Sequence, residues 1–172
     1  MIGDPYLISS WRKGKIELHG HDLENEGFTC RYDLLMQLVE IKTDLGIKTL
    51  DCSKIKKITI SDSANIVLVG GKEFELNGSP IVGLLEVLVD DTVPLLKRHL
   101  VTVKNPDYNP ALNAGRRDTR ILKQTKLYFA QGKSLVTIKN KKRLLQLLGE
   151  KSLLVDSYMI RIIYIYQMKV IA

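Results

Sequence analysis

Short segments in which apolar and polar residues alternate follow one another through residues 11–138, with turn-forming residues between them. Residues 15–18 (Lys-Ile-Glu-Leu) and 56–60 (Lys-Lys-Ile-Thr-Ile) are examples. A period of two is the pattern of a β-strand that has one face in the core and the other in water. The pattern therefore predicts a mainly β fold of the α+β class, an antiparallel meander sheet or a partly open barrel, with C-terminal helices.

Turn residues set the expected limits of the strands. Gly70-Gly71 and Gln131-Gly132 are expected to form two-residue hairpin turns in which glycine supplies positive φ. Pro94 cannot donate to a ladder, so its strand begins late, bulges or lies at an edge. The expected strands are residues 12–18, 28–33, 35–42, 47–51, 55–60, 65–69, 72–76, 81–89, 93–104, 120–130 and 133–138. Their inward positions predict a core of Ile16, Leu18, Phe28, Cys30, Tyr32, Ile58, Ile60, Val87 and Val89.

The pattern changes after residue 138. Asn140 can cap a helix that carries a leucine stripe at residues 144–148 and ends at Gly149, and a second helix is expected over 151–160. Residues 162–171 fit either a strand or a third short helix. The sequence thus predicts a β domain over residues 1–138 and a helical appendage over 139–172, packed on it as one structural unit.

The two cysteines are expected to be free, buried thiols. In a meander, the strands that carry Cys30 and Cys52 lie two strand spacings apart, about 9.6 Å. Bridged cysteines need Cα atoms within about 7 Å of each other. Both residues also alternate with apolar neighbours, so both side chains are expected to lie in the core.

The charge of the chain is divided unevenly. Residues 1–96 hold ten Lys/Arg against fifteen Asp/Glu, whereas residues 97–151 hold fourteen against three. Basic residues gather on the irregular stretch 105–119, at its exit, and at the start of the first expected helix, where they oppose the helix dipole. A solvated face and a site for phosphate or carboxylate groups both fit this pattern. The candidate ligand-binding residues are Arg116, Arg117, Arg120, Lys141, Lys142 and Arg143.

Signatures of catalysis are weak in this chain. Two histidines, His19 and His21, can share one strand face and bind a metal, but the chain has only one further histidine, and a polar hairpin explains them as well. Glu73 and Glu75 alternate on one strand, as carboxylates on any solvated strand do. No glycine-flanked nucleophile is present, and no cofactor or metal site is expected.

Several segments spread along the chain resemble a family of uncharacterised exported proteins from Bacteroidetes. They are 5–7 (Pro-Tyr-Leu), 11–14 (Trp-Arg-Lys-Gly), 31–33 (Arg-Tyr-Asp), 86–90, 95–98, 108–112 with Gly115, and 126–129 with 132–133. The resemblance runs through Gly149, and the hydrophobic residues 160–172 depart from it. It implies a periplasmic or secreted protein whose signal peptide has been removed.

Together these features predict a non-enzymatic interaction or structural module whose partner is a protein or an envelope component. The first alternative is a polyanion-binding protein that uses the basic surface of residues 97–151, and the second is a metal-dependent hydrolase. No window of the sequence is long and apolar enough for a transmembrane segment. Aromatic residues make up 6% of the chain and form no single-strand-binding motif, so nucleic acid is not the expected partner. An enzyme should show a pocket where polar groups converge, and a binding module an exposed apolar patch or an open sheet edge.

Overall fold

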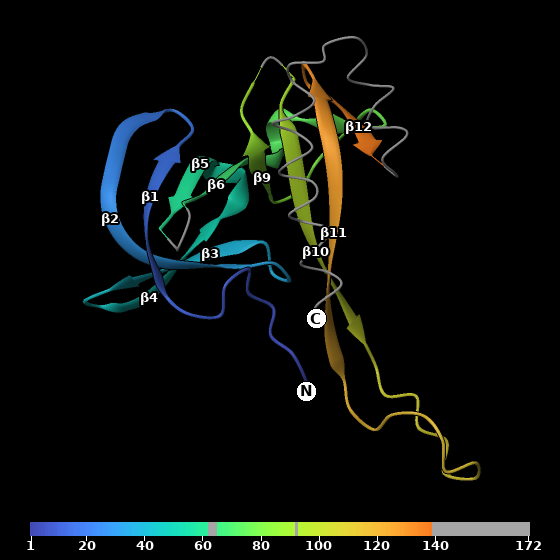
Figure 1. The fold of residues 1–172 in the computed structure, drawn as a ribbon. Helices are drawn as coiled ribbons and strands as arrows, with labels where there is room; N and C mark the ends of the chain where they lie inside the picture. The colour runs from blue at the N-terminus through green and yellow to red at the C-terminus, as the bar shows by residue number, and fades with distance from the viewer. Residues whose placement is uncertain (62–64, 92, 139–172) are drawn as a thin grey trace.

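A computed structural model describes residues 1–61, 65–91 and 93–138, with the backbone alone for residues 21–26 (Figure 1). Within these residues twelve strands form one mixed, open sheet in the order β4-β3-β2-β1-β5-β6-β9-β10-β11-β12-β7-β8. The mainly β fold is therefore confirmed, while the expected helices after residue 138 lie outside the described residues. The strands are β1 (Arg12–Leu18), β2 (His21–Asp33), β3 (Leu38–Thr43), β4 (Gly46–Asp51), β5 (Ile55–Ile60), β6 (Ile66–Gly70), β7 (Glu75–Leu76), β8 (Ser79–Pro80), β9 (Leu84–Val89), β10 (Leu95–Lys104), β11 (Arg120–Gln131) and β12 (Ser134–Ile138).

The sheet is not the simple meander that was expected. After β4 the chain makes the 3-10 turn η1 (Cys52–Lys54) and returns to pair β5 with the free side of β1. The short β7–β8 hairpin leaves β6 and joins the far end of the sheet, where Ser134 of β12 pairs in parallel with Glu75 of β7. Alternation within a strand does not specify its neighbour, because the neighbour is fixed by contacts between distant parts of the chain.

Within the described residues, two hydrophobic cores lie on opposite faces of the sheet. Leu68 belongs to the first core, whereas Val69, the next residue of β6, packs against the second. Successive side chains of a strand point to opposite faces, so the sheet changes its packed face at this strand and at β9. The first core contains Ile16, Cys30, Tyr32, Leu34, Val39, Cys52, Ile55, Ile58, Ile60, Leu68 and Leu84, and the second contains Ile81, Leu85, Leu96, Tyr128, Ala130 and Leu135.

Most of the expected core is buried. Ile16, Cys30, Tyr32, Ile58 and Ile60 are 2% exposed or less, and Leu18 and Phe28 pack half-buried at the margin of the first core. The prediction for β9 holds only in part: Val87 packs half-buried against the second core and Val89 is half-buried, while the fully buried residues are Leu84, Leu85 and Leu88. The cause is a register shift: Leu95 pairs with Val89 but Leu96 pairs with Val87, which leaves Leu88 as an inserted residue and breaks the alternation.

The glycines that were expected to form turns serve two different purposes. Gly132 has φ +61° and forms the β11–β12 turn, as expected. Gly70 has φ −60° and ends β6, so the prediction of a hairpin turn at 70–71 is wrong. Added Cβ atoms would lie 2.5 Å from the Ile55 oxygen at Gly70 and 2.6 Å from the Gly83 oxygen at Gly71. These two glycines therefore allow the backbone at residues 70–71 to lie close to the backbone of Ile55 and of Gly83.

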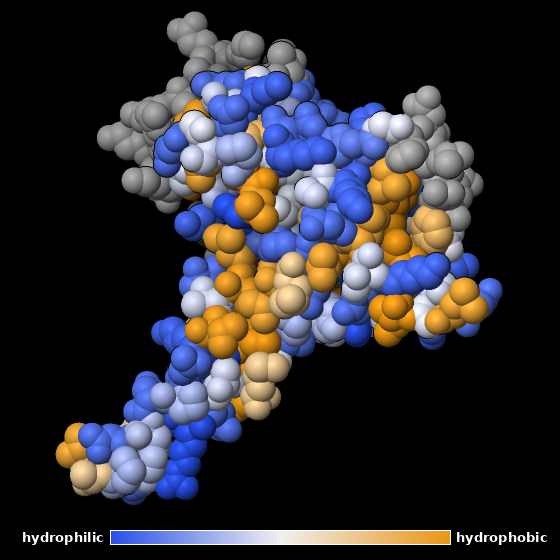
Figure 2. Space-filling model, turned by 180° about the vertical axis from the view of Figure 1, so that it is seen from behind, coloured by the Kyte–Doolittle hydropathy of each residue, from blue (hydrophilic) through white to orange (hydrophobic). Residues whose placement is uncertain are grey.

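A long arm extends from one side of the molecule. β10 and β11 pair from Leu95 with Phe129 to Lys104 with Arg120, and the loop 105–119 closes the far end (Figure 1). Pro94 lies just before β10, so that strand begins late, as one of the expected alternatives had it. Seen from behind, the arm stands clear of the body, with apolar residues along its stem (Figure 2).

Candidate functional site

The loop of the arm carries three of the six basic residues predicted to bind a ligand. Arg116, Arg117 and Arg120 lie at its exit and at the start of β11, and all three line one pocket. The other three, Lys141, Lys142 and Arg143, lie outside the described residues. The structure therefore describes the loop half of the predicted patch.

Local hydrogen bonds hold the loop in a defined shape. The Asp107 amide donates to the Arg116 oxygen over 2.9 Å, and the Asp107 carboxylate accepts the Arg116 amide over 2.7 Å. Beyond this pair Asn109 and Ala114 form an antiparallel bridge. The Asn109 side chain accepts the Ala111 amide, an Asx turn that bends the chain at its tip. The two sides of the loop are thus paired with each other and extend the two-stranded ribbon formed by β10 and β11.

Gly115 is the one position in this ribbon that requires glycine. Its φ is +90°, and a Cβ placed there would lie 2.3 Å from the Asp107 oxygen. Only a residue without a side chain allows the two strands of the ribbon to approach so closely. The direction of the backbone at Gly115 in turn determines the positions from which the side chains of Arg116 and Arg117 leave the loop.

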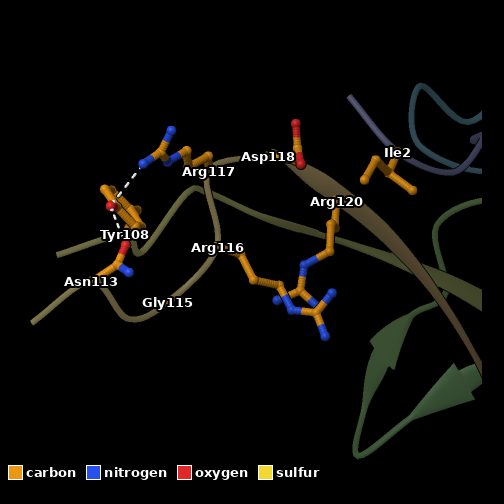
Figure 3. Close-up of a pocket in the computed structure, with 8 residues that line it drawn as sticks. All are labelled: Ile2, Tyr108, Asn113, Gly115, Arg116, Arg117, Asp118 and Arg120. Carbon is orange, nitrogen blue, oxygen red and sulfur yellow. Dashed lines mark hydrogen bonds between the residues drawn. The ribbon is translucent and has the colours of Figure 1, made fainter. Parts of the chain in front are cut away.

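The side chain of Arg117 contacts Tyr108 within the loop. Its guanidinium carbon lies 4.1 Å from the centroid of the Tyr108 ring, and its Nη2 donates to the Tyr108 hydroxyl over 2.7 Å. That hydroxyl donates to Asn113 Oδ1 over 2.8 Å (Figure 3). Arg117 and Tyr108 therefore form one wall of the pocket, and the guanidinium is already satisfied in part.

Arg116 and Arg120 point into the pocket from two places on the chain (Figure 3). The pocket has a volume of about 450 Å³ and includes Ile2 on its other side. The Nε of Arg120 is buried and has no hydrogen-bond partner within the described part of the chain. A buried donor without an acceptor costs free energy, so Arg120 is held here at a cost that a new acceptor would relieve.

The electrostatics of the pocket are positive on balance. Residues 104–120 contain four basic side chains and two acidic ones, Asp107 and Asp118. The Arg116 amide lowers the pKa of Asp107 by hydrogen bonding, and the positive charges of Arg120 and Arg116 lower it further. Asp107 is therefore an anion at neutral pH, and it offsets only part of the charge of the two arginines.

A strap at the N-terminus fixes the arm to the body of the protein. Ile2 pairs in parallel with Arg120, and the Asp4 carboxylate accepts from Lys123 Nζ over 3.1 Å. The next residues leave the arm: the Pro5 oxygen accepts the Leu34 amide over 2.8 Å, beside the end of β2. The strap was not predicted from the sequence.

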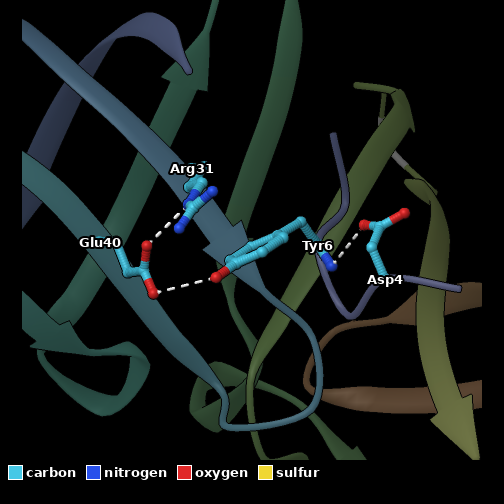
Figure 4. Close-up of polar contacts among 4 residues, drawn as sticks. All are labelled: Asp4, Tyr6, Arg31 and Glu40. Atoms are coloured by element: carbon cyan, nitrogen blue, oxygen red, sulfur yellow. Dashed lines mark hydrogen bonds and ion pairs between the residues drawn. The ribbon is translucent and has the colours of Figure 1, made fainter. Parts of the chain in front are cut away.

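An arginine sandwich secures the body end of the strap. The Arg31 guanidinium contacts both the Tyr6 ring and the Trp11 ring, 3.8 and 4.5 Å from their centroids. Arg31 Nε donates to the Glu40 carboxylate over 2.7 Å, and the Tyr6 hydroxyl donates to the same carboxylate over 3.3 Å (Figure 4). The side chains thus join the strap, β1, β2 and β3.

The second pocket lacks a reactive group. It has a volume of about 400 Å³ and lies between the β2–β3 turn and the β8–β9 loop, with Met36 and Val82 exposed at its rim. Cys52 lines it, but burial raises the pKa of this thiol to about 12. Cys30 is also free, with a pKa raised by burial to about 11, so both cysteines are unbridged, buried thiols as expected. Neither is a nucleophile at neutral pH.

Of the groups that were considered for catalysis, the structure places His19 beside Glu73 and puts Glu75 on a different element. His19 occupies the β1–β2 turn, and its Nε2 lies 3.6 Å from Glu73 in the 3-10 turn η2 (Gly71–Glu73). His21 has no described side chain, and Glu75 lies on β7 rather than on one strand with Glu73. Among the residues that the structure describes, no three His, Cys, Asp or Glu side chains gather where a metal ion would be held.

One ion cluster lies away from the pockets, where β9 pairs with β10. The Glu86 carboxylate accepts from Lys97 Nζ over 2.7 Å and contacts His99 Nε2 at 2.5 Å. Burial acts to raise the pKa of Glu86, but the hydrogen bond with His99 and the charge of Lys97 outweigh it and lower the pKa. All three side chains are less than a fifth exposed, so the cluster compensates buried charge within the sheet.

Comparisons with protein-family models, with curated proteins and with solved structures find no match to this chain. In the described residues, no helix has the length and apolar character needed to cross a bilayer. The geometry of the arm and of its pocket is therefore the basis on which a function can be inferred.

Proposed function

We propose that the protein is a periplasmic or secreted, non-enzymatic interaction module that binds an anionic partner through the end of its β10–β11 arm. The observation that carries the proposal is the arm itself. Val101 of β10 packs against the first core, but the loop 105–119 contributes to neither core, and it is still held in shape by hydrogen bonds and, at its exit, by a strap from the N-terminus. A long loop in a compact domain is commonly a functional element.

Two further surfaces favour binding over catalysis. β4 ends the sheet, and all but one of its residues are exposed; Ile47 on it is 58% exposed and Leu45 in the preceding turn is 90% exposed. Val103 on β10 and Ile2 in the strap beside the arm are also exposed. Figure 2 shows an apolar band along the stem of the arm. Open edges and exposed apolar patches are typical of surfaces that meet a partner.

Binding to immobilised heparin, used as a model polyanion, tests this proposal. The variant Arg116→Glu/Arg120→Glu should elute at clearly lower salt than the wild type, with a shallower dependence of log K on log salt, because fewer counterions are released. The control Lys42→Glu/Lys48→Glu makes the same change in net charge at exposed positions of β3 and β4, far from the arm in the strand order. Equal loss of retention in both variants would show a non-specific charge effect and would contradict the proposal.

A further inference from the structure

We infer that Arg116 and Arg120 together form a site for a phosphate group, a tetrahedral oxyanion carried by a larger molecule. This inference rests on the proposed function and names the chemical class of its ligand. The unsatisfied Nε of Arg120 is the first observation: it is buried and lacks an acceptor in the described part of the chain, so a side-chain adjustment that exposed it to an oxygen in the pocket would gain a hydrogen bond.

The convergence of two guanidinium groups is the second observation. Arg116 comes from the end of the loop and Arg120 from the start of β11, and both face the same pocket (Figure 3). Each guanidinium presents donors in a fixed planar fork. A carboxylate has two coplanar oxygens and one charge, which suit one fork. A phosphate has three free oxygens in different directions and carries a charge between about −1.5 and −2, which suits two.

The surroundings of the two arginines indicate that the phosphate is part of a larger ligand. A pocket of about 450 Å³ is much roomier than one phosphate group requires. Its walls are the Arg117–Tyr108 stack on one side and Ile2, 55% exposed, on the other. An aromatic ring and an aliphatic side chain fit the carbon-bearing part of a phosphate ester, which would lie between them while Arg116 and Arg120 hold the phosphate.

The tip of the loop distinguishes two sources of such a phosphate. Leu112 is 73% exposed in the turn where the Asn113 amide donates to the Pro110 oxygen. An apolar side chain at the end of a projecting arm can enter a lipid surface, with the basic residues behind it at the headgroups. A soluble phosphate ester would make no use of Leu112.

The experiment follows the Nε–H signal of Arg120 by NMR during titration with inorganic phosphate, at constant pH and ionic strength. The wild type should show a saturable shift with phosphate and a much weaker one with acetate. Arg116→Gln should weaken phosphate binding about tenfold, which corresponds to the loss of one charge-assisted hydrogen-bonding group. Lys48→Gln serves as the control and should leave the titration unchanged. Equal responses to phosphate and acetate, or no effect of Arg116→Gln, would overturn the inference.

Vesicles identify the source of the phosphate. Binding to vesicles that contain phosphatidic acid, reduced about tenfold by Leu112→Ser while phosphate binding is retained, would support a lipid headgroup. Phosphate binding with no effect of Leu112→Ser would support a soluble ester. Heparin retention that depends on Arg116 and Arg120 without any phosphate response would reject the phosphate site and leave the proposed function standing. Loss of both responses would reject both.

Discussion

Replacement of Arg31 tests how the strap and the first three strands are held together. Arg31→Ala removes a guanidinium that stacks on two rings and pairs with Glu40, and the two charged side chains are only 21% and 17% exposed. Each cation–π contact contributes about 0.5–2 kcal/mol, depending on desolvation. Removal of one partner of a buried ion pair costs about 3–5 kcal/mol, and the remaining exposure here reduces that figure. We therefore expect a loss of about 3 kcal/mol in the free energy of unfolding.

Urea denaturation measures this loss, and a double-mutant cycle assigns it. Arg31→Ala, Glu40→Gln and the double variant should give a coupling energy of about 1–2 kcal/mol between the two residues, because each single variant leaves the other group without its partner. Arg31→Lys keeps the charge but not the planar stack between Tyr6 and Trp11, so it should recover only part of the stability. At about 2–4 °C per kcal/mol for a chain of this size, Arg31→Ala should lower Tm by about 6–12 °C.

Two results would refute this reasoning. A loss below about 0.5 kcal/mol in Arg31→Ala would place the sandwich among surface ion pairs that contribute little. A coupling energy near zero, with a large loss in the single variant, would show that Arg31 acts through packing alone. In a matched comparison, Tyr6→Phe should cost less than about 1 kcal/mol, because it keeps the ring and loses only a 3.3 Å hydrogen bond.

Three further predictions follow from buried groups and from the strap. Cys30 and Cys52 should react with a thiol reagent only after unfolding. Their pKa values in the folded protein are raised to about 11 and about 12, so the unfolded chain loses these protons first as the pH rises above 9. The free energy of unfolding should therefore fall as the pH rises from 9 toward these values. Fast alkylation of the native protein would contradict this. Glu86→Gln should lower the free energy of unfolding by about 2 kcal/mol. Since the folded pKa of Glu86 is depressed, the wild type should also lose stability as the pH falls below about 4.5, and the variant should lack that component; identical acid titrations would contradict the ion cluster. Gly3→Ala should detach the strap, because φ is +90° and the new Cβ would lie 2.7 Å from the Ile121 oxygen; unchanged hydrogen exchange at the Ile121 amide would contradict it.

The strands that could be predicted from the sequence are those whose limits depend on local chemistry. β1 and β5 begin and end where alternation and turn residues place them. The strand expected at 35–42 begins later, at Leu38, because the Asp33 carboxylate accepts the Leu35 and Met36 amides and draws residues 34–37 into a turn. The sequence contains a signal for this turn, because Asp33 follows a strand. The apolar residues 34–36 that come next are equally typical of a strand and favour the opposite interpretation.

Features that depend on distant contacts could not be predicted in this way. The bulge at Leu88 is a feature of how β9 pairs with β10, and neither strand alone contains that information. Gly70 and Gly132 are the same residue in similar contexts, yet one serves backbone approach and the other a turn. The strap joins Ile2 to Arg120, which are far apart in the sequence. The sequence of the strap at residues 3–5, a glycine followed by an aspartate and a proline, is equally typical of an ordinary surface turn, so it does not predict this contact.

The candidate site shows the same division. Composition and charge identify the basic loop, but they treat Arg116, Arg117 and Arg120 as equal. The fold separates them: Arg117 stacks on Tyr108, whereas Arg116 and Arg120 face the pocket, and Arg120 keeps a donor there that no described residue satisfies. This difference comes from the path of the backbone at Gly115 and from the strap that holds the start of β11. A variant that loosens the strap should therefore weaken phosphate binding without touching an arginine, whereas simple attraction to a positive surface would be insensitive to it.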